Sequence, residues 1–245
     1  MKWGSFGIVH IATLLAAAAM IVGLYYALRR ASRAVQTGVL GALSFAGIAA
    51  IIYNLVTWGS PLEYLPLHLC SINAILLPIT VFSRNKTLGN MLLVWCLGAL
   101  AALVVNTAQA DYELDSATFA FYYFPHVLEF GIPILLFRLG LIEKKARYIG
   151  STIGITMAIY TGVHLVNVSL NGWCRINQIL DATGELIQVN YMYSLIPENP
   201  LLVLFRQAIP YDYWYMYMIV PILVIYLSLV YLPQLLHPKK VHCPV

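Results

Sequence analysis

The stretch FGIVHIATLLAAAAMIVGLYYAL, residues 6–28, contains no Asp, Glu, Lys or Arg. About 20 apolar residues in an α-helix cross a hydrocarbon core roughly 30 Å thick. Backbone polar groups in hydrocarbon must bond within their own segment, so we expect this run to be a transmembrane helix. The composition of the chain agrees: 61% of its 245 residues are hydrophobic, 10% are charged, and the mean hydropathy is +0.79. These values predict an integral membrane protein, because soluble domains are only about half apolar.

Six further apolar runs follow this first stretch. They are residues 36–58, 66–82, 88–107, 118–139, 148–170 and 212–236. None has the alternating pattern of about ten residues that is typical of a transmembrane β-strand. We therefore expect an all-α fold, a single membrane domain over residues 1–245. It is predicted to be a bundle of seven transmembrane helices with one long external loop at residues 171–211.

Basic residues gather at alternate ends of the expected helices. Eleven of the 14 are Arg29, Arg30, Arg33, Arg84, Lys86, Arg138, Lys144, Lys145, Arg147, Lys239 and Lys240. Lys and Arg are enriched in cytoplasmic loops, so the pattern predicts an external N-terminus and a cytoplasmic C-terminus. The net charge of +4 then reflects topology, and no nucleic-acid partner is expected.

Polar side chains fall mainly in the outer halves of the expected helices. They include His10, Asn54, His68, Asn73, Asn106, His126, Glu129, His164 and Asn167. Such side chains are costly in a membrane and usually face a bundle interior or a cavity, so they carry the functional signal. This asymmetry fits an enzyme acting on the outer leaflet better than a transporter, whose site is expected near the midplane.

His126 and Glu129 are three residues apart and share one helix face. The carboxylate can orient the imidazole as a general base, or the two can form a structural hydrogen-bonded pair. Cys70 and Asn73 share a face in the same way. His68 lies about 200° from Cys70 around a regular helix, so it is expected to face elsewhere.

Cys70 has three interpretations at this stage. A lone buried cysteine is most often a small hydrophobic residue. Cys70 lies near a helix N-terminus, however, where the dipole favours a thiolate. If the third and fifth helices pack together, His126 can reach it. A disulfide with Cys174 is the third possibility.

Three short segments resemble a known family. They are LPLHLC at residues 65–70, His126 preceded by Phe124 and Pro125, and NYMY at residues 190–193, followed by Pro200. Together they resemble the YwaF-like family of bacterial membrane proteins. That family is distantly similar to eukaryotic multispan lipid acyltransferases with a Cys/His pair, and to membrane hydrolases of the androgen-induced-gene type, which use Thr/His.

The resemblance implies that Cys70 is a nucleophile and His126 its base. Their separation, 126 minus 70, is 56 residues, close to that in the eukaryotic Cys/His proteins. It also implies a multi-pass protein of the bacterial cytoplasmic membrane. The bacterial family commonly has Asp after its cysteine and Gly after its histidine, where this chain has Ser71 and Val127. The substrate headgroup therefore stays open.

The leading hypothesis is a lipid acyltransferase or acyl-ester hydrolase that works near the outer leaflet through an acyl-enzyme, with membrane lipids as solvent and substrate. Glu129 or His164 would orient the base, and Asn73, Asn167 or Asn190 would bind the oxyanion. The supporting residues of this hypothesis are Glu129, His164, His68, Asn73, Asn167, Asn190 and Tyr191.

The alternative is a transporter or small-solute binding protein with an outward-facing polar vestibule; a noncatalytic assembly partner is a third possibility. No cofactor and no metal are expected. The sequence has no zinc-ligand spacing, no lysine for retinal in its last span, and no motif for a haem ligand.

Overall fold

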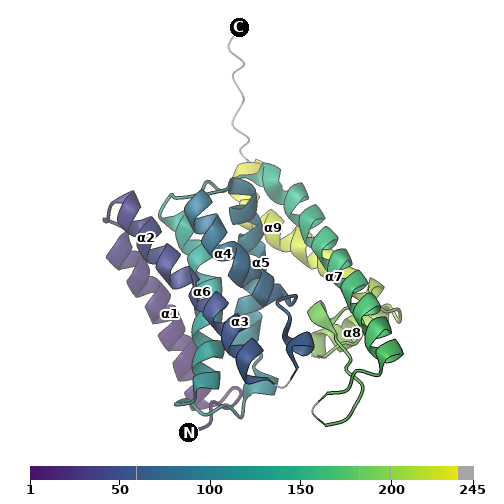
Figure 1. Ribbon diagram of the computed structural model, residues 1–245. Helices are drawn as coiled ribbons and strands as arrows, with labels where there is room; N and C mark the ends of the chain where they lie inside the picture. The colour runs from purple at the N-terminus through teal and green to yellow at the C-terminus, as the bar shows by residue number, and fades with distance from the viewer. Residues whose placement is uncertain (59, 182, 199, 237–245) are drawn as a thin grey trace.

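The computed structural model describes residues 1–58, 60–181, 183–198 and 200–236, and Figure 1 shows them as a bundle of long helices. The α-helices are α1 (Ile8–Leu28), α2 (Arg33–Ser44), α3 (Ala46–Thr57), α4 (Leu69–Ser83), α5 (Lys86–Val104), α6 (Ala117–Arg138), α7 (Ile149–Asn177), α8 (Pro200–Ala208) and α9 (Ile219–Leu236). Short 3-10 turns are η1 (Pro61–Tyr64), η2 (Thr107–Gln109), η3 (Ala146–Tyr148), η4 (Tyr191–Tyr193) and η5 (Trp214–Met218).

The predicted all-α class is confirmed for the described residues, where β-structure is limited to two isolated bridges. In the described part of the chain, six segments are long and apolar enough to cross a membrane. They are residues 8–28, 33–57, 86–104, 117–138, 146–177 and 214–236. The third expected span, 66–82, is not among them; it corresponds to α4, which has only 15 residues.

Local sequence explains why α4 is short. Pro66 lies in a turn, where the Leu67 N–H donates to the Leu65 carbonyl at 2.7 Å, so the helix starts only at Leu69. At the other end Arg84 adopts the left-handed conformation, with φ at 52°, and stops the helix. Hydropathy alone detects neither of these signals, and the expected start at residue 66 was three residues too early.

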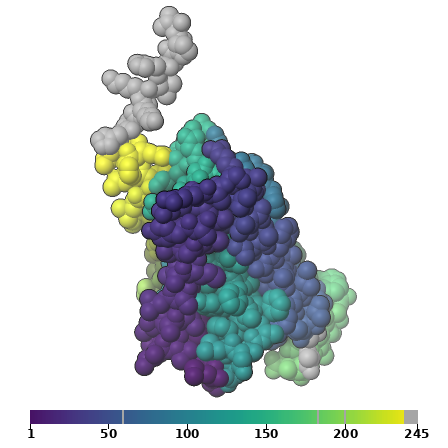
Figure 2. Space-filling model, turned by 90° about the vertical axis from the view of Figure 1, so that its left-hand side faces the viewer, coloured from purple at the N-terminus to yellow at the C-terminus, as the bar shows by residue number. Residues whose placement is uncertain are grey.

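The centre of the bundle is formed by α5 and α6. Eleven of the 22 residues of α6 are buried, against three of the 21 residues of α1. Figure 2 shows α1 lying along one side of the bundle, with α6 in teal reaching the surface between α1 and α3. The outward side chains of α1 are apolar: Ile8 is 89% exposed. This face fits a lipid environment, in which apolar side chains need no cover.

Three other boundaries differ from the expected ones. The second span is broken at Phe45 into α2 and α3. Helix α7 continues to Asn177, so the loop predicted at 171–211 starts later, and it contains the helix α8. The last span, expected at 212–236, begins with the 3-10 turn η5 before α9. Hydropathy windows miss such breaks and short amphipathic helices.

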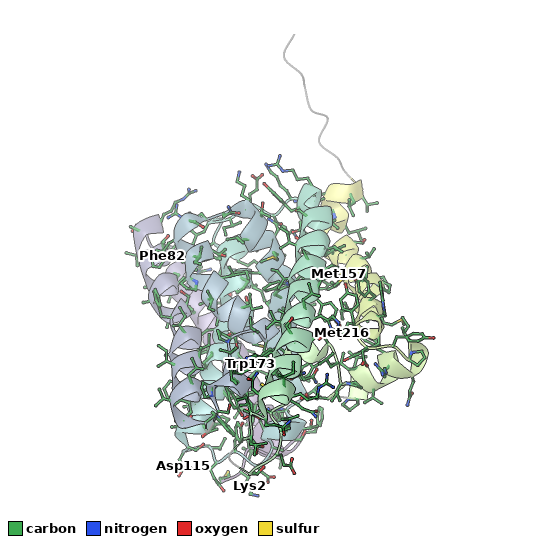
Figure 3. All side chains as sticks on the ribbon, turned by 45° about the vertical axis from the view of Figure 1, so that its right-hand side comes forward. Lys2, Phe82, Asp115, Met157, Trp173 and Met216 are labelled. Carbon is green, nitrogen blue, oxygen red and sulfur yellow. The ribbon has the colours of Figure 1, made fainter. Side chains whose placement is uncertain are left out.

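The two ends of the bundle differ in charge. Figure 3 places Lys2 and Asp115 together at one end and Phe82, the penultimate residue of α4, toward the other. Lys2 donates to the Asp111 carboxylate at 2.6 Å. Most basic residues lie in the α1–α2, α4–α5 and α6–α7 connections at the opposite end. Lys239 and Lys240, used in the orientation argument, lie outside the described residues.

Gly47 of α3 packs tightly against residues of α4 and α6. A Cβ at Gly47 would lie 2.6 Å from the Ala74 Cβ and 3.0 Å from Glu129 Oε1. A Cβ at Gly154, in α7, would meet nothing within 4 Å. Only the first glycine is therefore required by packing.

We expect Gly47→Ala to destabilise the protein by about 1–3 kcal/mol, because the added methyl overfills a packed contact. Gly154→Ala is the control, and it should be neutral or stabilising by about 0.5–1 kcal/mol through helix propensity. Thermal unfolding of both variants in detergent measures the difference. Equal midpoints would contradict the packing argument.

Candidate functional site

Three side chains with reactive or ligating atoms meet between α4 and α6. The Cys70 Sγ, a His126 ring nitrogen and a Glu129 carboxylate oxygen all lie within 4.8 Å of one another. Cys70 comes from α4, and the other two residues come from successive turns of α6. The predicted packing of these two helices thus brings together the cysteine and histidine that the sequence singled out.

Cys70 is the second residue of α4 and is half-buried. The positive end of the helix dipole therefore lies at its thiol and favours negative charge there. His68 precedes the helix in an extended conformation, with ψ at 153°. The side chain of His68 is for this reason free of the helical geometry that would point it about 200° away from Cys70.

The imidazole of His126 is held by its own helix. Its Nδ1 lies 2.6 Å from the Tyr122 carbonyl oxygen, and the Tyr122 ring packs against it with centroids 4.4 Å apart. A carbonyl can only accept, so Nδ1 carries the proton and Nε2 keeps a free lone pair. The hydrogen bond that orients this ring therefore comes from the backbone of Tyr122, and the role of Glu129 or His164 in orienting the base stays a prediction.

Glu129 and Asn73 are buried beside the pair. Their exposed fractions are 3% and 1%. The Asn73 amide lies next to the Glu129 carboxylate, but both amide atoms and Glu129 Oε2 lack a well-formed hydrogen bond within the described part of the chain. Buried polar atoms without partners are costly and call for an explanation such as a bound group. They mark the interior of the candidate site.

His68 lies at a contact between the two motif segments LPLHLC and NYMY. Its Nδ1 accepts from the Met192 N–H at 3.4 Å, and its ring lies 5.4 Å from Tyr191 and 5.6 Å from Tyr193, between centroids. Tyr193 is also near enough to Cys70 to interact with it electrostatically. His68 therefore positions the loop that follows α7 next to Cys70.

Two asparagines on α7 bind the backbone of this loop. Asn167 donates to the Tyr191 carbonyl at 2.8 Å and accepts from the Tyr191 N–H at 3.0 Å. One turn further along, Asn171 makes the same two bonds with Val189, at 2.9 and 2.7 Å. Asn167 was predicted as an oxyanion donor. Its amide groups are already engaged, and it is a loop anchor instead.

His164 joins the same contact. Its Nδ1 lies 3.0 Å from Ser194 Oγ, which also accepts from Asn167 at 2.8 Å. The ring of His164 packs against Tyr213 with centroids 4.7 Å apart. These partners place His164 at the loop, so its predicted role at His126 is not supported.

Asn190 and Tyr191 are likewise used within the loop. The Asn190 amide donates to the Ile196 carbonyl at 2.8 Å and to the Glu198 carboxylate at 2.6 Å. The Tyr191 hydroxyl donates to the Leu62 carbonyl. Of the predicted oxyanion donors, only Asn73 keeps an unengaged amide.

Two groups of residues thus emerge from the predicted set. One lies at the reactive pair: Cys70, His126, Glu129 and Asn73. The other fixes the loop: His68, His164, Asn167, Asn190 and Tyr191. Sequence reasoning missed Tyr122, Asn171 and Ser194, although Asn171 repeats Asn167 at a spacing of four and offered a signal.

The site has the ligand types of a metal centre as well. A thiolate, an imidazole and a carboxylate can bind zinc at about 2.0–2.3 Å, leaving a fourth position open. The Glu129 Oε2 atom, which has no hydrogen-bond partner among the described residues, fits this chemistry. Cys70 and Cys174 are both free thiols, so the conceivable disulfide between them is absent, and Cys174 is buried among apolar residues.

The sequence model of the TMEM164 family matches residues 5–231. The chain belongs to the TMEM164 family. This is a multispan membrane family, which agrees with the six candidate spans. No curated protein and no solved structure matches the chain. The finer resemblance to the YwaF-like family stays a prediction.

We expect Asn167→Ala to loosen residues 187–194, because it leaves the buried N–H and carbonyl of Tyr191 without partners at a cost of about 1–3 kcal/mol. Faster hydrogen exchange in this segment is the measurement. Asn177→Ala is the matched control: Asn177 lies on the same helix but bonds only the Trp173 carbonyl of its own turn. Unchanged exchange in Asn167→Ala would contradict the anchoring role.

Proposed function

We propose that this TMEM164-family protein is a membrane-embedded acyltransferase or acyl-ester hydrolase that uses Cys70 as nucleophile and His126 as base. The observation that carries the proposal is the placement of the Cys70 thiol within 4.8 Å of a His126 ring nitrogen, on two packed helices. A nucleophile beside a base that a third group orients is the arrangement expected for covalent catalysis.

The first step transfers the acyl group to the enzyme. His126 Nε2 takes the thiol proton while the sulfur attacks the ester carbonyl, so a C–S bond forms. When the tetrahedral intermediate collapses, the ester C–O bond breaks and the imidazolium returns the proton to the departing alcohol oxygen. The products are a thioester on Cys70 and a lipid with one acyl chain fewer.

The second step consumes the thioester. A hydroxyl group of an acceptor lipid, or water, attacks the thioester carbonyl after losing its proton to His126. The C–S bond breaks and the thiol recovers the proton. A hydroxylated lipid gives transfer and water gives hydrolysis, so the acceptor that reaches the site decides between the two activities.

Asn73 is the candidate oxyanion donor. It lies three residues after Cys70 on the same face of α4, and its buried amide nitrogen has no well-formed hydrogen bond among the described residues. A preorganised donor at this place would stabilise the negative charge of the intermediate. The requirement for a free donor favours Asn73 over Asn167 and Asn190.

The proposed topology places this chemistry near the outer leaflet of a bacterial cytoplasmic membrane. It counts α4 as a seventh span, with an external N-terminus. The basic connections that follow α1, α4 and α6 support the cytoplasmic assignment of that end. A short helix can cross there because α2, α3, α5 and α6 surround it and shield its ends from lipid.

An acyl-enzyme trap tests the mechanism. Purified protein in liposomes that contain a phospholipid with a radiolabelled acyl chain should acquire a label that neutral hydroxylamine removes, as expected for a thioester. Cys70→Ala should acquire none. His126→Gln should acquire it roughly 10²–10⁴-fold more slowly, which is the usual cost of losing a general base.

Cys96→Ala is the control for this trap, because Cys96 is a buried thiol on α5 that donates to the Leu93 carbonyl. It should label as the parent does. Label on Cys70→Ala would refute the proposal. Stoichiometric zinc that is present in the parent and lost in Cys70→Ala would instead assign the three side chains to a metal centre.

Cysteine accessibility tests the topology. An impermeant maleimide added to intact cells should label Asp115→Cys and Asp181→Cys, but should label Arg30→Cys and Ser83→Cys only after permeabilisation. The maleimide labelling of each variant is compared with that of the unsubstituted chain, which contains four cysteines of its own. Labelling of Ser83→Cys in intact cells would show that α4 does not cross the membrane.

A further inference from the structure

A second polar site lies at the opposite end of the bundle from Cys70. A cavity of about 410 Å³ lies between α5, the end of α6, the α6–α7 connection and α9, with both cationic and apolar walls. Its lining residues are Leu93, Ile134, Phe137, Arg138, Lys144 and Val230. The volume falls within the range of about 300–1,000 Å³ that is usual for ligand sites.

The two cations of this cavity lie at its mouth. Arg138 is the last residue of α6, is exposed, and forms no hydrogen bond or ion pair with any other described residue. Lys144 is half-buried, donates to the Val230 carbonyl at 2.7 Å, and lies 5.5 Å from the centre of the Tyr231 ring. Neither cation has a carboxylate partner in the described chain.

The nearest acidic residue is already engaged. Glu143 lies 2.8 Å from the Lys145 ammonium and 3.6 Å from that of Lys86. Burial lowers the pKa of Lys144, and the positive charge of Arg138 lowers it further. The two cations therefore repel each other, and an anion bound between them would remove this repulsion.

The part of the cavity away from the two cations is lined by apolar side chains. Ile134 lies four residues before Arg138 on α6, about 6 Å deeper at 1.5 Å per residue. Leu93 lies seven residues into α5 from Lys86, about 10 Å from the start of that helix by the same rise. A ligand that fills the cavity must therefore combine an anionic end with a hydrocarbon part.

We propose that this cavity binds an anionic phospholipid, with its phosphate between Arg138 and Lys144 and part of one chain along Leu93, Ile134 and Val230. Guanidinium groups bind phosphate through paired hydrogen bonds. Basic pockets between transmembrane helices bind anionic headgroups on the cytoplasmic side, where the positive-inside pattern places this end.

The bound lipid would also brace the α6–α7 connection. Gln234 of α9 accepts from the Ala146 N–H at 2.8 Å and donates to the Lys144 carbonyl at 2.6 Å. A phosphate bound by Arg138 and Lys144 would add a further contact at this connection, beside the two hydrogen bonds of Gln234. We therefore expect the lipid to raise thermal stability, independently of any chemistry at Cys70.

Delipidated protein in detergent, titrated with phosphatidylglycerol, phosphatidylcholine or inorganic phosphate, tests the proposal. Native mass spectrometry should detect bound phosphatidylglycerol, and the unfolding midpoint should rise with that lipid alone. Arg138→Gln should weaken binding about tenfold, as expected for a lost charge-assisted hydrogen bond. Because Arg138 has no hydrogen-bond or ion-pair partner among the described residues, this variant should fold as the parent does.

Arg30→Gln is the matched control, since it removes an exposed charge in the α1–α2 turn at the same end of the bundle. It should bind phosphatidylglycerol as the parent does. Lys144→Arg should retain phosphatidylglycerol binding, whereas Lys144→Gln should lose it. Equal binding by Arg138→Gln, equal binding of phosphatidylcholine, or stabilisation by inorganic phosphate alone would each overturn the proposal.

Discussion

A polar group inside an apolar bundle must find its partner within the protein, and this constraint organises the structure. His10 is fully buried, and it meets the constraint by bonding the Phe6 N–H through Nδ1 and the Leu103 carbonyl through Nε2. Asn167 meets it by binding the backbone of Tyr191. Among the groups that do not meet it, Glu129 and Asn73 lie beside the only cysteine and histidine that the described chain brings together with a carboxylate.

The helices were largely predictable because a membrane span is defined by length and apolar content. Length and apolar content do not predict local breaks, however. The second span is interrupted at Phe45 although no proline or glycine occupies that position. Helix α8 was missed because nine residues with Leu202 and Phe205 buried make too short a pattern within a loop. Asn90 was also overlooked, although it bonds the carbonyls of Lys86 and Glu143 and so fixes the α6–α7 connection.

The site was predictable only in part, and for a different reason. The sequence pointed to Cys70, His126 and Glu129 because their spacing and the family resemblance agreed. It could not distinguish Asn73 from Asn167, since both are asparagines in the same half of the expected spans and both are buried. The difference depends on which backbone lies opposite each amide, and only the path of residues 187–194 in space decides that.

The shortness of α4 has an electrostatic consequence for Cys70. Fifteen residues extend about 22 Å, roughly 8 Å less than the hydrocarbon core that neighbouring helices cross. Because Arg84 and Lys86 fix the other end near the basic surface, the missing length falls on the side of Cys70. In the proposed topology, the unpaired N–H groups of the first turn then lie below the membrane surface, away from bulk water that would screen them. Transporters hold anionic groups at such positive helix ends within the bilayer, and here the field is centred on a thiol.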